Sequence, residues 1–221
     1  MTGCTRISEG CHHCYAERLA RRLKGINPKY ANAFKPTLHR NGLEEPLSWK
    51  RPRRVFVCSM GDLFHEDVPD DFVKDVFDVM RRARPHVFQV LTKRSERLLD
   101  LTKKMELTEN VWVGVTVESE QHLDRIKDLT RVSAPVKFLS CEPLLSKIDN
   151  LPLDGIDWVI VGGESGVGCR PMEAEWVRSI RNVCVSRGVP FFFKQWGGVN
   201  RKAAGRLLDG RQWDEMPDKK K

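Results

Sequence analysis

Six short runs of apolar residues are spaced along this 221-residue chain and alternate with amphipathic stretches. Each run is continuously apolar, which is typical of parallel strands that are covered on both faces of a sheet. The runs predict strands at residues 55–58, 87–91, 111–115, 136–139, 158–161 and 191–193. Strands that alternate with helices favour an α/β fold with a parallel sheet.

Apolar positions at helical spacing predict helices in the segments between and before these strands. The expected helices span residues 15–24, 44–50, 69–83, 119–129 and 173–186, with a further helix that begins after residue 94. Ser95 is the expected N-cap of that further helix, and Ser119 is expected to start the next one. Residues 140–157 predict a poor helix or a bare loop.

Polar or charged residues follow nearly every predicted strand. They are Ser59 and Asp62, Thr92 and Lys93, Thr116 and Glu118, Ser140 and Glu142, Gly162, Gly163 and Glu164, and Lys194 and Gln195. A barrel collects its active site from the carboxyl ends of many strands, whereas a doubly wound sheet concentrates it at one switch point. We therefore predict a full or partial TIM-like (β/α) barrel.

Composition limits the class of protein without identifying its activity. The length suits one domain over residues 1–221, with a cysteine loop and first helix at 1–24 and a polar tail at 197–221. The net charge of +8 points to an acidic partner such as nucleic acid, although basic residues on exposed helix faces also explain it. Without a membrane-length apolar run or a leader before the cysteines, we expect a cytoplasmic protein with no membrane partner.

Three of the seven cysteines, Cys4, Cys11 and Cys14, share one short polar loop with the spacing C-x6-C-x2-C. An odd cysteine count in a reducing compartment favours metal ligation over disulfides. Three thiolates suit either zinc or an iron–sulfur cluster. Zinc would take His12 or His13 as its fourth ligand, whereas a four-iron cluster would keep one iron open for a substrate or cofactor.

Charged groups at the predicted strand ends are further candidates. Lys93 and Lys194 can bind phosphate or form a Schiff base at a barrel mouth, and Glu142 is a candidate acid or base. Arg94, by contrast, is expected to open a surface helix. Cys141 could face the site.

A glycine-rich loop follows the fifth predicted strand. Gly162 and Gly163 let backbone N–H groups approach an anion or an adenosyl group, although a tight turn explains them equally well. Glu164 and Arg170 can bind the ammonium and carboxylate of an amino-acid moiety. Trp112, Trp158 and Trp196 could stack on a base, but as tryptophans beside apolar strand residues they are expected in the core.

The cysteine motif continues into Tyr15-Ala16-Glu17, and further short motifs follow it along the chain. They are Asn27-Pro28-Lys29-Tyr30, Ser59-Met60-Gly61-Asp62-Leu63-Phe64-His65, Leu91-Thr92-Lys93-Arg94, Ser140-Cys141-Glu142-Pro143-Leu144, Val161-Gly162-Gly163-Glu164-Ser165-Gly166, Phe193-Lys194-Gln195-Trp196-Gly197 and residues 204–210. In this order they resemble a phage-associated three-Cys-motif family of unknown function that is grouped with the radical SAM superfamily. The chain departs from it at the start, where we expect the first barrel strand to be missing.

The resemblance implies a radical SAM-like barrel enzyme. Cys4, Cys11 and Cys14 would hold a 4Fe–4S cluster, and the open iron would bind S-adenosylmethionine. An electron donor would drive formation of a 5′-deoxyadenosyl radical, which acts on an unknown, nucleic-acid-related substrate. Tyr15 would lie near the adenine, and the pocket would be lined by Glu118, Glu142, Glu164 and Arg170. Two alternatives stay open: a zinc-binding barrel hydrolase, and a non-enzymatic nucleic-acid-binding protein with a structural cluster.

Overall fold

The computed structural model describes residues 1–200, 203 and 205–217, and a six-stranded parallel sheet forms its centre. The strands are β1 (Arg54–Val57), β2 (Val87–Thr92), β3 (Val111–Thr116), β4 (Val136–Cys141), β5 (Trp158–Gly162) and β6 (Phe191–Gln195). Each strand pairs in parallel with the next one in the chain. The predicted α/β fold and all six strand positions are confirmed.

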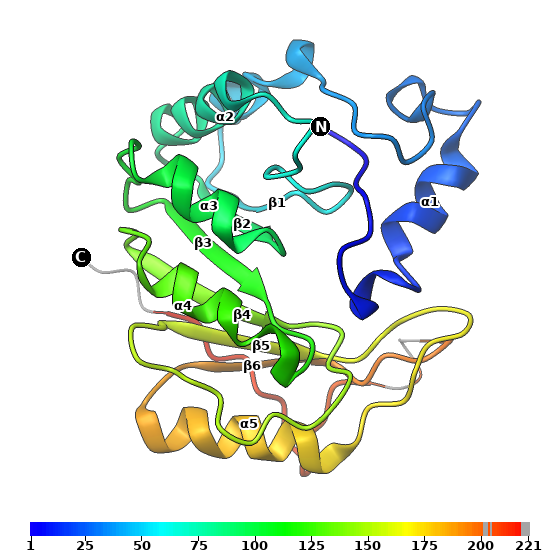
Figure 1. The fold of residues 1–221 in the computed structure, drawn as a ribbon, viewed down its shortest axis with the longest axis vertical. Helices are drawn as coiled ribbons and strands as arrows, with labels where there is room; N and C mark the ends of the chain where they lie inside the picture. The colour runs from blue at the N-terminus through cyan, green and yellow to red at the C-terminus, as the bar shows by residue number, and fades with distance from the viewer. Residues whose placement is uncertain (201–202, 204, 218–221) are drawn as a thin grey trace.

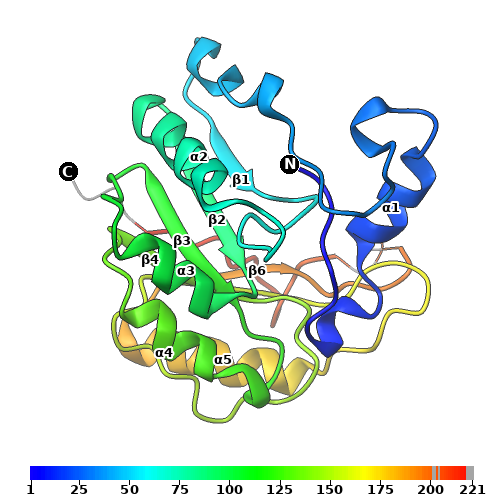
Figure 2. The same ribbon diagram turned by 45° about the horizontal axis from the view of Figure 1, so that its top comes forward.

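The sheet curls into a half-barrel, with β1 and β6 at its two edges (Figure 1). The α-helices are α1 (Tyr15–Leu23), α2 (Asp70–Arg82), α3 (Ser95–Thr102), α4 (Asp124–Thr130) and α5 (Ala174–Arg187). Short 3-10 helices are η1 (Glu9–Cys11), η2 (Pro28–Tyr30), η3 (Arg40–Gly42), η4 (Glu45–Ser48) and η5 (Glu120–His122). Figure 2 shows α2 to α5 along the outside of the sheet, whereas α1 stands apart, beyond the strand ends.

Apolar side chains of the sheet and of the outer helices form the main core. From α2, Phe72, Val73 and Phe77 pack into it, and from α5, Ile180 and Cys184 do the same. Acidic residues in the first turn of α2 and arginines in its last turn complement the helix dipole. No helix in the described part of the chain is both long and apolar enough to cross a membrane.

A separate aromatic cluster fills the concave face of the sheet. Trp112, Phe138 and Trp158 are buried there, and the Trp112 and Trp158 rings meet edge to face at 6.1 Å. The core positions predicted for both tryptophans are confirmed. Since these residues lie in the first half of their strands, they fill the half-barrel away from the carboxyl ends. The strand ends therefore stay open for a pocket.

The capping role predicted for Ser95 is wrong, and the helix predicted to start at Ser119 is divided into η5, which has Ser119 as its N-cap residue, and α4. Ser95 is the first residue of α3, and its hydroxyl donates to Asp128 at 2.6 Å instead of capping the helix. The hydroxyl of Ser119 donates to Glu9 at 2.8 Å, and α4 begins only at Asp124, after η5. Residues 142–157 form the bare loop that was one of the two expectations.

The N-terminal residues lie beside the β1 edge without forming a strand. Gly3 makes an isolated parallel bridge to Gly61, and Thr2 makes an antiparallel bridge to Thr37. These bridges hold the start of the cysteine loop at the carboxyl end of β1. Among the described residues, the sheet begins with β1.

The predicted polar tail is held against the sheet at a few buried residues, while most of its described residues are exposed. Phe192 of β6 bridges Asp214 in antiparallel fashion, and the Trp158 indole donates to the carbonyl of Glu215 at 2.9 Å. Leu208 is fully buried, and Trp213 is 8% exposed. Residues 201, 202, 204 and 218–221 of the predicted tail lie outside the described residues. The described tail segment thus covers the β6 edge of the half-barrel.

Replacing Trp213 by alanine is expected to lower the free energy of unfolding by about 3–5 kcal/mol, the usual cost of deleting a buried indole. The ring contacts Phe191 and the Arg211 guanidinium, so a cavity would open beside β6. Urea unfolding measures the change. Leu207→Ala is the control, because Leu207 is 54% exposed and should cost less than about 0.5 kcal/mol. Equal effects would contradict a structural role for this segment.

Candidate functional site

One pocket of about 260 Å³ opens at the carboxyl ends of the strands, a volume near the lower end of small-molecule sites. Its strand-end lining residues are Ser59, Asp62, Thr92, Lys93, Thr116, Ser140, Glu142, Glu164, Lys194 and Gln195. All six strands therefore contribute to it directly or through the residues that follow them. This confirms the prediction that the polar strand ends converge on one site.

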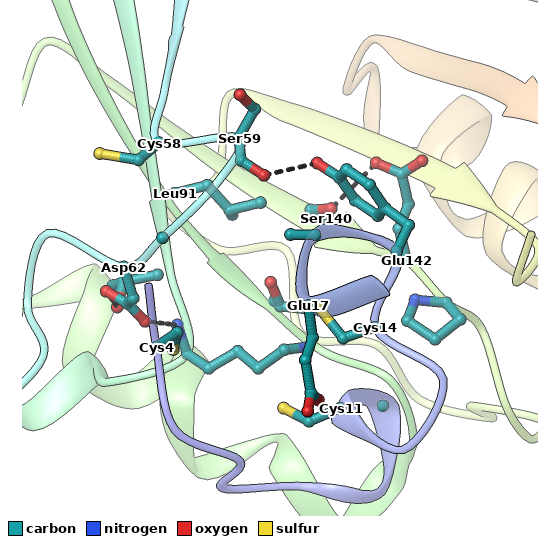
Figure 3. Close-up of a pocket in the computed structure, with 18 of the residues that line it drawn as sticks. Cys4, Cys11, Cys14, Glu17, Cys58, Ser59, Asp62, Leu91, Ser140 and Glu142 are labelled. Atoms are coloured by element: carbon teal, nitrogen blue, oxygen red, sulfur yellow. Dashed lines mark hydrogen bonds between the residues drawn. The ribbon is translucent and has the colours of Figure 1, made fainter. Parts of the chain in front are cut away.

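The thiols of Cys4, Cys11 and Cys14 line the same pocket, and none of them is in a disulfide. Figure 3 shows the three side chains around one cavity, with Glu17 of α1 beside them. Cys58 also lines the pocket, but its sulfur points away from the other three (Figure 3). In the described residues, no group of three or more His, Cys, Asp or Glu side chains is arranged to hold a single metal ion.

Arg94 lies against the first of these cysteines. Its guanidinium donates to Cys4 Sγ at 3.4 Å and to Asp62 at 3.2 Å, and its side chain is 9% exposed. The expectation of a surface position for Arg94 is wrong, because the cysteine loop covers it. Burial and the negative charge of Asp62 outweigh Arg94 and raise the pKa of the Cys4 thiol to about 11.

The loop around Thr5 is held by a buried histidine. His65 Nδ1 accepts the backbone N–H of Asp67 at 3.0 Å, which leaves Nε2 to bond the Thr5 hydroxyl at 2.8 Å. Burial and the nearby Arg94 lower the pKa of His65, so its neutral form is favoured. His65 thus acts as a positioning residue for the cysteine loop.

A second clamp holds the loop through Glu118, which is fully buried at the end of β3. The carboxylate pairs with Lys93, with Arg125 at 2.7 Å, and with the Ser8 hydroxyl at 2.5 Å. Burial alone would raise the pKa of Glu118, but Lys93 and Arg125 outweigh it and lower the pKa. The structure therefore brings the predicted residues Lys93 and Glu118 together, beneath the loop.

Glu9 anchors the middle of the loop to the β3–α4 connection. It accepts hydrogen bonds from Ser119 at 2.8 Å and from His122 at 2.9 Å. Burial works against ionisation, but the bonds from His122, the backbone and Ser119 outweigh it and lower the Glu9 pKa to about 2. The loop is thus a bonded part of the fold at several points along its length.

Glu164 and Arg170 pair with each other. Arg170 Nη2 donates to Glu164 Oε1 at 2.6 Å, and its Nε donates to Oε2 at 3.0 Å. The same Nη2 also reaches the carbonyl of Glu9 at 2.9 Å. This pair therefore ties the glycine-rich loop to the cysteine loop. Binding of an amino-acid moiety by these two residues stays a prediction.

Ionised Glu164 is expected to contribute to the free energy of unfolding at neutral pH and to lose this contribution in acid. Burial would raise its pKa, but hydrogen bonds from Arg170 outweigh this and lower the pKa below its ordinary value of 4.5. Because the pKa of Glu164 is lower in the folded than in the unfolded protein, its ionised form stabilises the fold at pH values above 4.5. This stabilisation is lost as the pH falls through the pKa of the folded protein. Glu164→Gln should therefore be destabilised at pH 7, and its difference from wild type should shrink on acidification. Urea unfolding across the pH range tests this, and a constant difference would contradict it.

Gly162 and Gly163 serve close packing around the site. A side-chain carbon on Gly163 would lie 2.0 Å from the carbonyl oxygen of Trp196. One on Gly162 would lie 2.6 Å from the Glu142 carboxylate. Because neither glycine carries a side chain, the end of β5 can lie this close to the residues that follow β4 and β6. The tight-packing explanation is thereby supported, and contact with a cofactor stays a prediction.

Glu142 and Lys194 form a charged pair on the pocket wall formed by β4 and β6. Lys194 Nζ lies 3.0 Å from Glu142 Oε1, and the Ser140 hydroxyl donates to Oε2 at 3.1 Å. Figure 3 shows Ser140 and Glu142 across the cavity from Cys4. The Lys194 side chain is 52% exposed, so the pair faces the open pocket. Cys141, which stands between Ser140 and Glu142 in the sequence, lies in the main core. This corrects the expectation that Cys141 could face the site.

Helix α1 closes the rim of the pocket through two side chains. The Tyr15 hydroxyl donates to the carbonyl of Ser59 at 2.8 Å, and 55% of the residue is exposed. Arg18 donates to the carbonyls of Ser165 and Val167 at 2.8 and 2.7 Å, which fixes the glycine-rich loop. Arg18 was missed from the sequence, because it follows the polar helix pattern of any exposed arginine.

Comparison with known proteins gives a family without an assigned activity. A family model described as "Protein of unknown function (DUF5131)" matches residues 1–217. No curated protein and no solved structure matches the chain. The matched segment contains the cysteine loop, the whole sheet and the packed tail segment, in line with the expected resemblance to an uncharacterised family. The chain belongs to this family of proteins of unknown function, DUF5131.

Proposed function

We propose that this protein is a radical SAM-like iron–sulfur enzyme built on a partial TIM-like barrel. Cys4, Cys11 and Cys14 would ligate three irons of a 4Fe–4S cluster, and S-adenosylmethionine would bind the fourth. One observation carries the proposal: three free thiols of a single loop line one pocket at the carboxyl ends of a curled parallel sheet. Active sites of parallel barrels lie at this end.

The donor set suits a cluster better than zinc. The thiolates of a cluster bind different irons, so they lie farther apart than the ligands of one tetrahedral ion. Within the described residues, no side-chain group is arranged for a single ion; His12 is exposed, whereas His13 lines the pocket. Arg94 beside Cys4 places a positive charge where thiolate ligands would add negative charge. The lack of a single-ion arrangement among the described residues supports a cluster over the zinc site of a barrel hydrolase, whereas the charge of Arg94 would suit thiolates in either site.

When bound, the cluster held by Cys4, Cys11 and Cys14 would supply reductive cleavage of S-adenosylmethionine for hydrogen abstraction, with the electron coming from an external donor. The chain supplies binding groups for this cofactor. Glu142 and Lys194 present opposite charges to the pocket, which complement an ammonium and a carboxylate. Tyr15 would cover the adenine from the rim, where its hydroxyl is held on the carbonyl of Ser59.

Metal analysis of anaerobically purified protein tests the cluster. We expect a brown protein with about four irons and about four acid-labile sulfides per chain, as a 4Fe–4S cluster requires. A colourless protein with about one zinc per chain would overturn the proposal in favour of the zinc-binding hydrolase. Cluster-loaded protein is then incubated with S-adenosylmethionine and dithionite, and 5′-deoxyadenosine is measured by chromatography. Iron without 5′-deoxyadenosine would favour the non-enzymatic alternative.

A further inference from the structure

A second cavity, of about 730 Å³, lies on the solvent side of the cysteine loop. Its walls come from the loop, from Glu17, Arg21 and Lys24 along α1 and its C-cap, and from residues 32–36. It shares with the cysteine pocket the lining residues Cys4, Thr5, Arg6, Glu17 and Phe34. The two cavities therefore adjoin along this stretch of the loop, and Cys4 borders both of them.

The outer cavity, here called the basic groove, is lined by the basic residues Arg6, Arg21, Lys24 and Lys35 and by one acid, Glu17. Arg6 and Arg21 both pair with Glu17, at 2.9 and 2.6 Å, and their side chains are still 56% and 70% exposed. Lys24 and Lys35 are exposed and have no ion-pair partner in the described part of the chain. Four positive charges against one negative make the groove a site for a polyanion.

The far wall of the groove is fixed to the cysteine loop by its backbone. The N–H of Cys4 donates to the carbonyl of Phe34 at 3.0 Å, and Thr2 and Thr37 exchange two backbone hydrogen bonds. A side-chain carbon on Gly3 would lie 2.2 Å from the carbonyl of Lys35. Phe34 is thus held where the groove meets the cysteine pocket, and this residue lines both cavities.

We propose that the basic groove binds the backbone of single-stranded nucleic acid and delivers one nucleotide, stacked on Phe34, to the cysteine pocket. A cationic groove combined with an aromatic platform is how proteins bind single strands without reading their sequence. The inference rests on the proposed function and names the substrate class of that site. Its free cations, Lys24 and Lys35, contact phosphates, while the ring of Phe34 contacts a base.

Fluorescence anisotropy of a labelled single-stranded oligothymidylate tests the groove with the cluster-loaded full chain. Net neutralisation of about three phosphates predicts a slope of roughly −2 in log K against log salt concentration. Lys24→Glu/Lys35→Glu should weaken binding at least tenfold at low salt and flatten the slope. Lys104→Glu/Lys127→Glu is the matched control, because it makes the same charge change on exposed lysines outside the groove. It should change the affinity less than about twofold.

Phe34→Ala should weaken binding of the oligothymidylate but leave binding of an abasic strand of equal length unchanged. The inference would be overturned if the two double variants lost the same affinity for the oligothymidylate. It would also be overturned if Phe34→Ala weakened binding of the oligothymidylate and of the abasic strand equally. Polyglutamate that competes as well as the oligonucleotide would also overturn it, because the groove would then bind any polyanion. Iron and 5′-deoxyadenosine measured on the same samples separate the two proposals, since either can fail while the other holds.

Discussion

Replacing Cys11 by alanine is expected to lower the bound iron from about four atoms to less than about one per chain after anaerobic purification. The structure offers three free thiols at the pocket, and a cluster held by two of them would lack a ligand for one more iron. Formation of 5′-deoxyadenosine should be lost with the iron. Iron and sulfide analysis, together with the cofactor-cleavage assay, measures both effects.

Cys169→Ala is the matched control for this prediction. Cys169 is also a free, half-buried thiol, but it does not line the pocket. Its replacement should leave iron content and 5′-deoxyadenosine formation unchanged. Urea unfolding of both variants without metal should agree within about 0.5 kcal/mol, which excludes misfolding as the cause of iron loss. Full iron content in Cys11→Ala would contradict the assigned ligand set.

Replacing Glu118 by alanine is expected to lower the free energy of unfolding by about 3–5 kcal/mol. The change leaves the buried guanidinium of Arg125 without its carboxylate and removes the acceptor for Ser8. Without that acceptor, the cysteine loop loses one of its clamps. Urea unfolding measures the stability, and hydrogen exchange of residues 4–14 should rise by more than the global change alone requires.

Glu66→Ala serves as the comparison for Glu118. Glu66 also bonds Arg94 and Thr5, but its side chain is 62% exposed, so its loss should cost less than about 1 kcal/mol. If Glu118→Ala costs no more than Glu66→Ala, the buried clamp does not hold the loop. A large stability loss without faster exchange in residues 4–14 would assign Glu118 to the core alone.

The strands and helices could be predicted because their signals are local. Continuous apolar runs mark β1 to β6, and helical spacing of apolar residues marks α2 and α5, as the structure confirms. The convergence of polar residues at one pocket could also be predicted, because parallel strands place their carboxyl ends at one edge. Ser95 was wrong as an N-cap because its hydroxyl bonds to the distant Asp128, and Ser119 precedes η5 instead of a continuous helix.

Side-chain partners could not be predicted, since they depend on contacts between residues far apart in the chain. Arg94 and Cys4 are separated by 90 positions, and Ser8 and Glu118 by 110. Which face of β4 a residue occupies was also undecided, and the strand alternation sends Cys141 into the core. The described tail segment looked polar and basic, although Leu208 and Trp213 bury their side chains against the sheet region.

The amino-acid sequence by itself determined the order of strands and helices, the spacing of the three cysteines, and the set of polar groups that end the strands. Those properties are encoded in neighbouring residues, whose periodicity and spacing can be read along the chain. Only the tertiary structure decided that Lys93 pairs with Glu118 and that Arg170 pairs with Glu164, next to the cysteine loop. It also decided that the pair of Glu142 and Lys194 faces the open pocket. Burial forces each charged group to find a partner, and the folded backbone determines which partner lies within reach.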